Sequence, residues 1–133
     1  MSREDLKYNE LTEAIINAAM KVHRSLGLGF PEIIYQRALL VELSMRGIES
    51  KAEQELPVYY ENVLVGKRRL DLLVEDKILV ELKAVSELEK KYFNQVLNYL
   101  EAFNVEIGLL LNFGTESLQI KRFINNKYQP NKD

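Results

Sequence analysis

The 133-residue sequence has no cysteine and only one histidine, His23. Without cysteine, the chain cannot form a disulfide, a thiolate zinc site, a cysteine-ligated iron–sulfur cluster or a cysteine nucleophile. A single histidine also excludes a multi-histidine metal site, and a Ser-His-Asp triad would have to use His23. Any metal would therefore be held mainly by carboxylates, which favours magnesium, manganese or calcium.

Long apolar runs and a strong net charge are missing as well. No run approaches the roughly 20 residues of a membrane-spanning helix. The segment MSREDLKYNE carries acids and has no apolar stretch, so it does not resemble a signal peptide, and we expect a cytoplasmic protein. The net charge of −2 does not drive the chain onto nucleic acid or lipid. Contact with nucleic acid would need a local basic patch.

The composition is that of one globular domain. Hydrophobic residues make up 47% of the chain, which is enough for a core, and no repeat or linker is evident. We expect a single domain over residues 1–133, with its core over 8–124 and a frayed tail over 126–133.

Two helices are predicted in the first third of the chain. The first spans residues 8–26, and Gly27 is expected to end it in a left-handed conformation. Its apolar residues recur at helical spacing: Leu11, Ile15, Ala18, Val22 and Leu26. The second helix is expected to have Pro31 in its first position and to stop at Gly47. Its expected apolar stripe is Ile34, Ala38, Val41 and Met45.

The middle of the chain changes to a two-residue period, which predicts strands. The predicted strands cover residues 54–60, 63–74 and 78–85, and the second range could hold one strand or two. Glu61 and Asn62 are expected to form a turn, and Gly66 a bend or bulge.

The last third predicts one helix and two strands. Ser86 and Glu89 have the spacing of a capping box, which would open a helix that runs to about Phe103. Its expected inward residues are Phe93, Val96, Leu97 and Leu100. Residues 105–113 predict a buried strand, and 117–123 a strand nearer the edge. The order α-α-β-β-β-α-β-β predicts an α/β fold of mixed α+β type, with helices flanking a central mixed sheet.

The hairpin RRLDLLVEDKILVELKA, residues 68–84, carries charges among apolar residues. If residues 75–77 form a three-residue loop, Asp71 lies directly opposite Glu81, and their Cβ atoms are roughly 5 Å apart. Lys83 lies two residues further on and shares that face. A two-residue loop would shift the register and remove the direct pairing.

Two interpretations of these charges remain open. Opposed carboxylates repel unless a cation or a proton lies between them, and a hard divalent cation is one solution. The alternative is a solvated face with an ion pair between Glu81 and Lys83. Leu73 and Leu79 share the charged face, which favours the rim of a cleft over open solvent.

Further candidates lie on the predicted helices and beside the hairpin. Gln95 and Tyr99 share a helix face at i, i+4 and could reach the acids, or they could simply pack beside their neighbours Tyr92 and Leu88. Tyr35, three residues after Glu32, could orient that acid or serve as a core aromatic. The basic residues that could contact phosphates, or form a solvated face, are Lys67, Arg68, Arg69, Lys90 and Lys91.

Three motifs resemble one nuclease superfamily. Asp71, a nine-residue gap and Glu81-Leu82-Lys83 resemble the signature of the PD-(D/E)XK nuclease superfamily, which has the restriction-endonuclease-like fold. The segment QVLNY, residues 95–99, matches the Gln-x-x-x-Tyr of RecB-like nucleases. The segment GFPEIIY, residues 29–35, is similar to the signature of the small GxxExxY proteins of that superfamily. The sequence departs from the pattern at Leu70, where the superfamily name has proline.

The resemblance implies a site and a reaction. Asp71, Glu81 and Glu32 would hold Mg²⁺ or Mn²⁺, with the Leu82 carbonyl as a further ligand. Lys83 would position the attacking water. The remaining implied residues are Gln95 as catalytic, and Tyr99, Tyr35, Arg68, Arg69, Lys90 and Lys91 as substrate-binding. The implied activity is metal-dependent hydrolysis of phosphodiester bonds in DNA or RNA.

The partners that the resemblance implies follow from this activity. Nucleic acid is the main one. Separately from the resemblance, the modest net charge and the small size favour a second copy of the chain as a further partner, and the lack of a long apolar run predicts no membrane partner. The alternative is a nucleic-acid-binding or protein-interaction module that keeps the fold without cutting.

Overall fold

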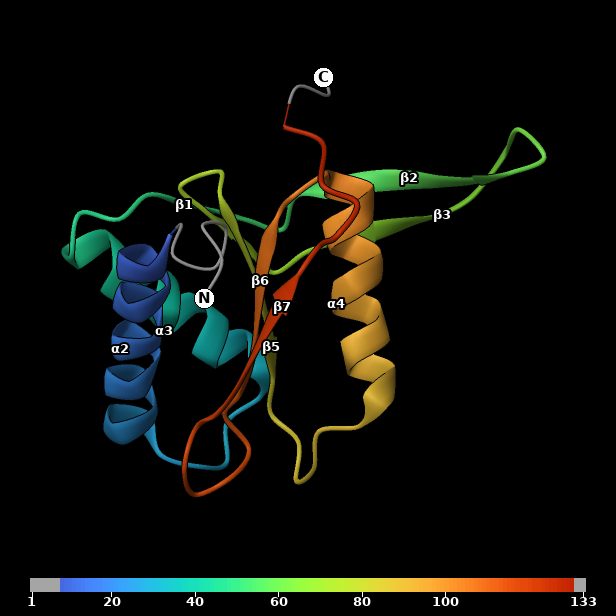
Figure 1. Cartoon of the computed structure of the whole chain (residues 1–133). Helices are drawn as coiled ribbons and strands as arrows, with labels where there is room; N and C mark the ends of the chain where they lie inside the picture. The colour runs from blue at the N-terminus through green and yellow to red at the C-terminus, as the bar shows by residue number, and fades with distance from the viewer. Residues whose placement is uncertain (1–7, 131–133) are drawn as a thin grey trace.

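The computed structural model describes residues 8–130 as a five-stranded mixed sheet with helices on both faces (Figure 1). The helices are α2 (Asn9–Leu26), α3 (Glu32–Met45) and α4 (Lys90–Phe103). The main sheet has the order β1 (Ser50–Ala52), β4 (Leu72–Val74), β5 (Ile78–Lys83), β6 (Ile107–Asn112) and β7 (Gln119–Ile124). Strands β5 and β6 are parallel, and the other neighbours are antiparallel. The predicted mixed sheet with flanking helices is confirmed.

The two faces of the sheet pack against different helices. Side chains of β5 at even positions, such as Val80 and Leu82, lie in a core with α2 and α3. At odd positions, Leu79 packs with Val96 and Leu100 of α4. Because side chains alternate along a strand, residues 81 and 83 of β5 also point toward the α4 side. None of the described helices has both the length and the apolar character needed to cross a membrane.

The first helix buries its predicted stripe but ends differently at Gly27, whereas the second helix turns a different face inward. In α2 the expected stripe is buried or half-buried, and Gly27 ends the helix with φ 71° and ψ −162°, outside the left-handed helical conformation. In α3 two residues of the predicted stripe, Val41 and Met45, are 59% and 72% exposed. The residues that α3 buries are Tyr35, Gln36, Leu39 and Leu43. Apolar residues surround this helix, so their spacing alone does not select one face. Pro31 is the residue before the helix, not its first residue.

Residues 50–74 form one long hairpin that is bent in the middle. Its inner half, β1 with β4, belongs to the main sheet, and its outer half is a separate pair, β2 (Glu55–Tyr60) with β3 (Val63–Arg69). Backbone bonds cross the bend: Glu53 N–H donates to the Asp71 carbonyl at 3.1 Å, and Leu70 N–H to the Gln54 carbonyl at 3.0 Å. Glu53 takes a φ of 57° at this point. We call β2 and β3 with their connecting turn the arm, which projects past α4 (Figure 1).

Details of the hairpin differ from the sequence prediction. The turn at Glu61 and Asn62 is confirmed, and both have positive φ. The register shift leaves Val65 unmatched, one residue before the predicted bulge at Gly66. Strand β1 was not predicted, because Ser-Lys-Ala has little strand preference of its own and depends on pairing with β4.

The capping box predicted for α4 is wrong. The helix begins at Lys90, after Glu89, and no side chain caps it. The preceding loop is held elsewhere: Asn112 accepts from Val85 N–H at 3.0 Å and donates to the Val85 carbonyl at 3.0 Å. This delays the start of the helix. Leu97, predicted to point inward, is 42% exposed.

Two further predictions concern the ends of the chain: the amino-terminal segment MSREDLKYNE and the frayed tail over residues 126–133. Residues 1–7 and 131–133, which include most of the amino-terminal segment and the end of the predicted tail, lie outside the described part. Before that point, Gln129 N–H donates to Asn104 at 3.0 Å, and Asn104 donates to the Gln129 carbonyl at 2.8 Å.

Gly114 lies directly against the loop that follows β5. A Cβ atom on Gly114 would overlap the backbone nitrogen and oxygen of Val85, so Gly114→Ala must displace one of the two segments. We expect this variant to lose about 2 to 4 kcal/mol of unfolding free energy. Gly66→Ala is the matched control, because nothing lies within 4 Å of its added Cβ. Urea unfolding of both variants tests the expectation, and equal stabilities would contradict it.

Candidate active site

The predicted register of the charged hairpin is confirmed. Val74 pairs with Ile78 and Leu72 with Val80, so residues 75–77 form a three-residue loop. Continuing this register places Asp71 opposite Glu81. Both acids lie on the side of the sheet that α4 covers.

The two acids stand where β4 and β5 separate. Strand β4 begins at Leu72, and at Asp71 the chain turns away into the arm, so β5 loses its antiparallel neighbour beyond Val80. Side chains replace the missing backbone partners. The Glu81 carboxylate Oε2 accepts from Asp71 N–H at 2.6 Å, and the Asp71 carboxylate Oδ2 accepts from Leu82 N–H at 2.8 Å. The Leu82 carbonyl points to the same side as its N–H, toward this fork between the strands.

Burial makes this acid pair hold a proton. Glu81 is 3% exposed, and burial, followed by the charge of Asp71, raises its pKa to about 9. Burial also raises the pKa of Asp71, while the hydrogen bond from Leu82 N–H and the charge of Lys83 oppose that increase. At neutral pH we therefore expect Glu81 to hold a proton.

Glu32 and Lys83 complete the charged cluster. Glu32 is the first residue of α3, and burial, followed by the charge of Asp71, raises its pKa. Lys83 lowers the pKa of Glu32, Asp71 and Glu81 alike. Its Nζ atom lies 4.8 Å from the centre of the Tyr92 ring. The fold thus brings an acid from α3 to the electrostatic neighbourhood of the hairpin acids and their lysine.

Helix α4 brings Gln95 and Tyr99 to one face. Both are half-buried, and Gln95 Nε2 donates to the Tyr99 hydroxyl at 3.4 Å. Tyr99 packs against the same core cluster as Tyr92 and Leu88. Gln95 and Tyr99 therefore share a helix face, as predicted. Tyr99 also packs beside Tyr92 and Leu88, which was the alternative explanation for this pair.

The predicted phosphate-binding residues differ in whether a carboxylate already pairs with them. Arg69 pairs with Glu55 at 2.9 Å, and Lys91 pairs with Glu89 at 3.1 Å. Arg68 donates to Asn98 of α4 at 2.8 Å, and Lys90 is exposed at the start of that helix. These groups lie along the arm and α4, on the side of the sheet that carries the acids.

Tyr35 is placed beneath the surface. It is 1% exposed, and its ring stacks on Phe113 with 4.8 Å between ring centres. Its hydroxyl donates to the Gly27 carbonyl at 2.6 Å, and Phe30 N–H donates to that hydroxyl at 3.4 Å. Tyr35 therefore ties down the loop that leads to Glu32.

Comparison with known proteins identifies the family. The model of the PD-(D/E)XK nuclease superfamily matches residues 9–123. This chain belongs to that superfamily. The crystal structure of SSO0001 matches with a TM-score of 0.58 and 19% identity, over 71% of this chain and 50% of that one. At this identity the likeness shows the fold alone, and the matched part is about half of that chain. A search of curated proteins found no match.

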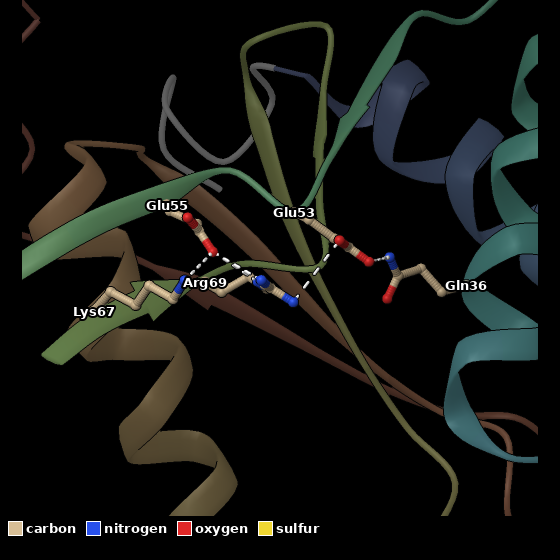
Figure 2. Close-up of polar contacts among 5 residues, drawn as sticks. All are labelled: Gln36, Glu53, Glu55, Lys67 and Arg69. Carbon is tan, nitrogen blue, oxygen red and sulfur yellow. Dashed lines mark hydrogen bonds and ion pairs between the residues drawn. The ribbon is translucent and has the colours of Figure 1, made fainter.

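In this PD-(D/E)XK protein, two residues near the acids were missed by sequence analysis. Gln36, buried in α3 one turn after Glu32, donates to Glu53 at 3.5 Å (Figure 2). Glu53 in turn lies 3.8 Å from Arg69, and its charge contributes to the raised pKa of Asp71. The i, i+4 spacing from Glu32 could have pointed to Gln36. No sequence signal placed Glu53, because its position depends on the bend.

The donor set at the fork fits a hard divalent cation. Across residues 8–130, no three acidic or histidine side chains gather closely enough to hold an ion together. The fork instead offers two carboxylates and the Leu82 carbonyl, all of them oxygen donors. Mg²⁺ suits such a set, because it keeps several water ligands and commonly binds through one or two carboxylates.

Proposed function

We propose that this chain is a divalent-metal-dependent nuclease that hydrolyses phosphodiester bonds of nucleic acid with water. The burial of Glu81 beside Asp71 is the observation that carries the proposal. Burying two carboxylates together destabilises a fold, and a hairpin with a purely structural role would have apolar residues there. Perturbed acids beside a lysine are typical of catalytic sites, and the superfamily gives them a reaction.

The metal ligands in this proposal are Asp71, Glu81 and the Leu82 carbonyl, while Glu32 acts through a water molecule. A bound Mg²⁺ or Mn²⁺ would supply an acidified water and would neutralise charge on the phosphate. Glu81 must release its proton before it can ligate. Lys83 orients the attacking water and donates to the phosphate oxygens as their charge increases.

The remaining residues bind and position the substrate. Gln95 and Tyr99 contact the phosphate next to the cleaved bond, and Arg68 and Lys90 contact the neighbouring phosphates. Arg69 and Lys91 would reach phosphates only by exchanging their carboxylate partners. Tyr35 acts indirectly, by holding the loop that ends at Glu32.

The GxxExxY motif has a structural role that supports membership of this smaller group. Gly29 has a φ of 105°, a conformation that side chains rarely adopt, and it lies in the loop that Tyr35 fixes. The glycine lets the loop turn, and the tyrosine closes it. Together they set the position of Glu32 at the first residue of α3.

The proposed function is tested by titrating Mn²⁺ and Mg²⁺ into the protein with labelled single-stranded, duplex and branched DNA and RNA. We expect cleavage of at least one substrate that requires the metal and is lost in Glu81→Ala. Isothermal calorimetry on the same samples measures metal binding separately. Metal binding without cleavage of any substrate would contradict the nuclease and favour a binding module that keeps the fold.

A further inference from the structure

The end of β5 that carries Lys83 is paired with a strand on one side only. Strand β4 pairs with β5 as far as Val80, so in the described part of the chain Lys83 has one strand neighbour, β6. Its partner there is Asn112, the last residue of β6, and Phe113 N–H donates to the Lys83 carbonyl at 2.8 Å. A strand end with one neighbour opens more readily than the middle of a sheet. A further contact beyond this bond would keep Lys83 in one position.

The side chain of Asn112 makes such a contact with the loop that follows Lys83. Its Oδ1 atom accepts from Val85 N–H at 3.0 Å, and its Nδ2 atom donates to the Val85 carbonyl at 3.0 Å. Because β5 and β6 are parallel, the loops that follow them lie at the same end of the sheet (Figure 1). The amide therefore extends the pairing of the two strands past Lys83, where it takes the place of a backbone peptide group.

The burial of this amide indicates a specific role. Asn112 is fully buried, whereas the other five residues of β6 are apolar or glycine. An unpaired buried amide destabilises a fold, but every hydrogen-bonding position of Asn112 is used. Its two remaining bonds are from Gly114 N–H at 3.1 Å and to Gln119 Oε1 at 2.9 Å. A fully bonded buried amide fixes one geometry, which an apolar side chain of the same size would not do.

Close packing at Gly114 holds the same loop. A Cβ atom on Gly114 would overlap the backbone nitrogen and oxygen of Val85 and would crowd the carbonyl carbon of Ala84. Ala84 and Val85 are the two residues that follow Lys83. Residues 112–114 therefore fix the chain directly after Lys83 in two ways, by the bonds of a buried amide and by close backbone contact.

The reach of the Lys83 side chain depends on how firmly its backbone is held. Its Nζ atom lies 4.8 Å from the centre of the Tyr92 ring, on the side of the sheet that carries the acids. Lysine has a flexible four-carbon side chain, so a loose backbone would spread its ammonium group over many positions. Fewer molecules would then have the lysine placed to act on water or phosphate.

We propose that Asn112 is a positioning residue of the nuclease, which acts on Lys83 through the loop at Val85. This role rests on the proposed function, because Lys83 would otherwise have no reaction to serve. The four bonds of Asn112 go to Val85, Gly114 and Gln119, and none of these is a proposed metal ligand. Asn112 therefore sets the position of the lysine and leaves the metal ligands in place.

Asn112→Ala tests this role by separating catalysis from metal binding. We expect kcat of metal-dependent cleavage to fall about 10- to 100-fold, because a displacement of about 1 Å at a catalytic group has an effect of this size. Calorimetry should give a Mn²⁺ affinity within about twofold of the wild type, because the bonds of Asn112 do not reach the acids at the fork. A general loss of structure would lower both quantities together.

Two further variants show whether Asn112 acts through Lys83. In a Lys83→Met background, adding Asn112→Ala should lower kcat no further, because the group that Asn112 positions is already absent. Gln119→Ala is the matched control: Gln119 is exposed, and its loss removes one bond of the amide but leaves both bonds to Val85. This control should keep the kcat of the wild type. Circular dichroism confirms that each variant is folded.

NMR of the metal-free protein measures the position of Lys83 without cleavage. The ε-methylene protons of Lys83 should be shifted upfield by the Tyr92 ring, over which the side chain lies. Asn112→Ala should lose most of this shift, and Gln119→Ala should keep it. If the wild type cleaves no substrate, the proposed function fails, while this shift still shows whether Asn112 places the lysine.

Several results would overturn the proposal. They are an unchanged kcat, a parallel loss of kcat and Mn²⁺ affinity, a further loss in the Lys83→Met background, and an unchanged Lys83 shift. If Asn112→Ala does not fold, hydrogen exchange of the wild type gives the answer. The Val85 amide, bonded to Asn112, should exchange as slowly as the Phe113 amide, bonded to Lys83. Fast exchange at Val85 alone would show that Asn112 does not hold the loop.

Discussion

Lys83→Met is expected to lower kcat of metal-dependent cleavage by about 100- to 1000-fold. Lys83 is the cation that acts on all three acids of the site, and it stands at the end of β5 over the Tyr92 ring. Methionine keeps an unbranched side chain against that ring but cannot donate to water or phosphate. Because the lost interaction grows as charge develops on the phosphate, the effect should appear mainly in kcat.

The neighbouring lysine provides the control for this variant. Lys91 also lies over the Tyr92 ring, at 5.4 Å, but it pairs with Glu89 instead of the site acids. Lys91→Met is therefore expected to raise KM a few-fold and to preserve kcat. Steady-state kinetics of both variants at saturating metal make the comparison. Equal losses of kcat would show that Lys83 acts only through the surface charge it shares with Lys91.

Glu81→Gln is expected to stabilise the metal-free protein by about 2 to 3 kcal/mol at pH 7. In the folded protein the pKa of Glu81 is raised from 4.5 to about 9, so the folded state keeps a proton that the unfolded chain releases. Glutamine resembles the protonated acid: its oxygen can accept from Asp71 N–H, and its amide can donate to the Asp71 carboxylate. The variant therefore avoids the free-energy cost of keeping the Glu81 carboxyl group protonated in the folded protein at pH 7.

The raised pKa of Glu81 also determines whether the free energy of unfolding rises or falls with pH. Between pH 4.5 and about 9 the unfolded chain binds fewer protons than the folded one, so the stability of the wild type falls as pH rises. In Glu81→Gln this contribution is absent, and the decline should be shallower. Urea unfolding in a chelator at pH 5.5, 7 and 8.5 measures both profiles, with the exposed Glu87→Gln as a control for lost charge. Parallel profiles for Glu81→Gln and the wild type would show that Glu81 is ionised in the folded protein.

The register of the site was predictable, because it depends on local counting. Three residues between Val74 and Ile78 are enough to place Asp71 opposite Glu81, and alternation then puts Lys83 on the same face. The mixed α/β fold was predictable because segments with apolar residues at helical spacing and segments with a two-residue period follow one another along the chain. Family motifs added Glu32, which lies 39 positions before Asp71 and which no spacing rule connects to the hairpin.

Features that depend on tertiary geometry were not predictable. The bend at Glu53 requires a positive φ at a glutamate, and such a conformation has no strong sequence signal. The sequence does not indicate the bend, so it predicts that the arm continues the main sheet and gives no sign that β4 and β5 separate at Asp71. The inward face of α3 was misassigned for a similar reason: its apolar residues surround the helix, and the sheet selects which of them to bury.

The bent hairpin also divides the site between regions of unequal local stability. Strands β5 and β6 are buried along almost their whole length, so their amide hydrogens should exchange with solvent only when the whole molecule unfolds. The arm is largely exposed, and its amides should exchange through local opening. Asp71 lies at the boundary between the two regions. Local opening of the arm would therefore carry Asp71 away while Glu81 and Lys83 stay in place, which takes the site apart without unfolding the protein.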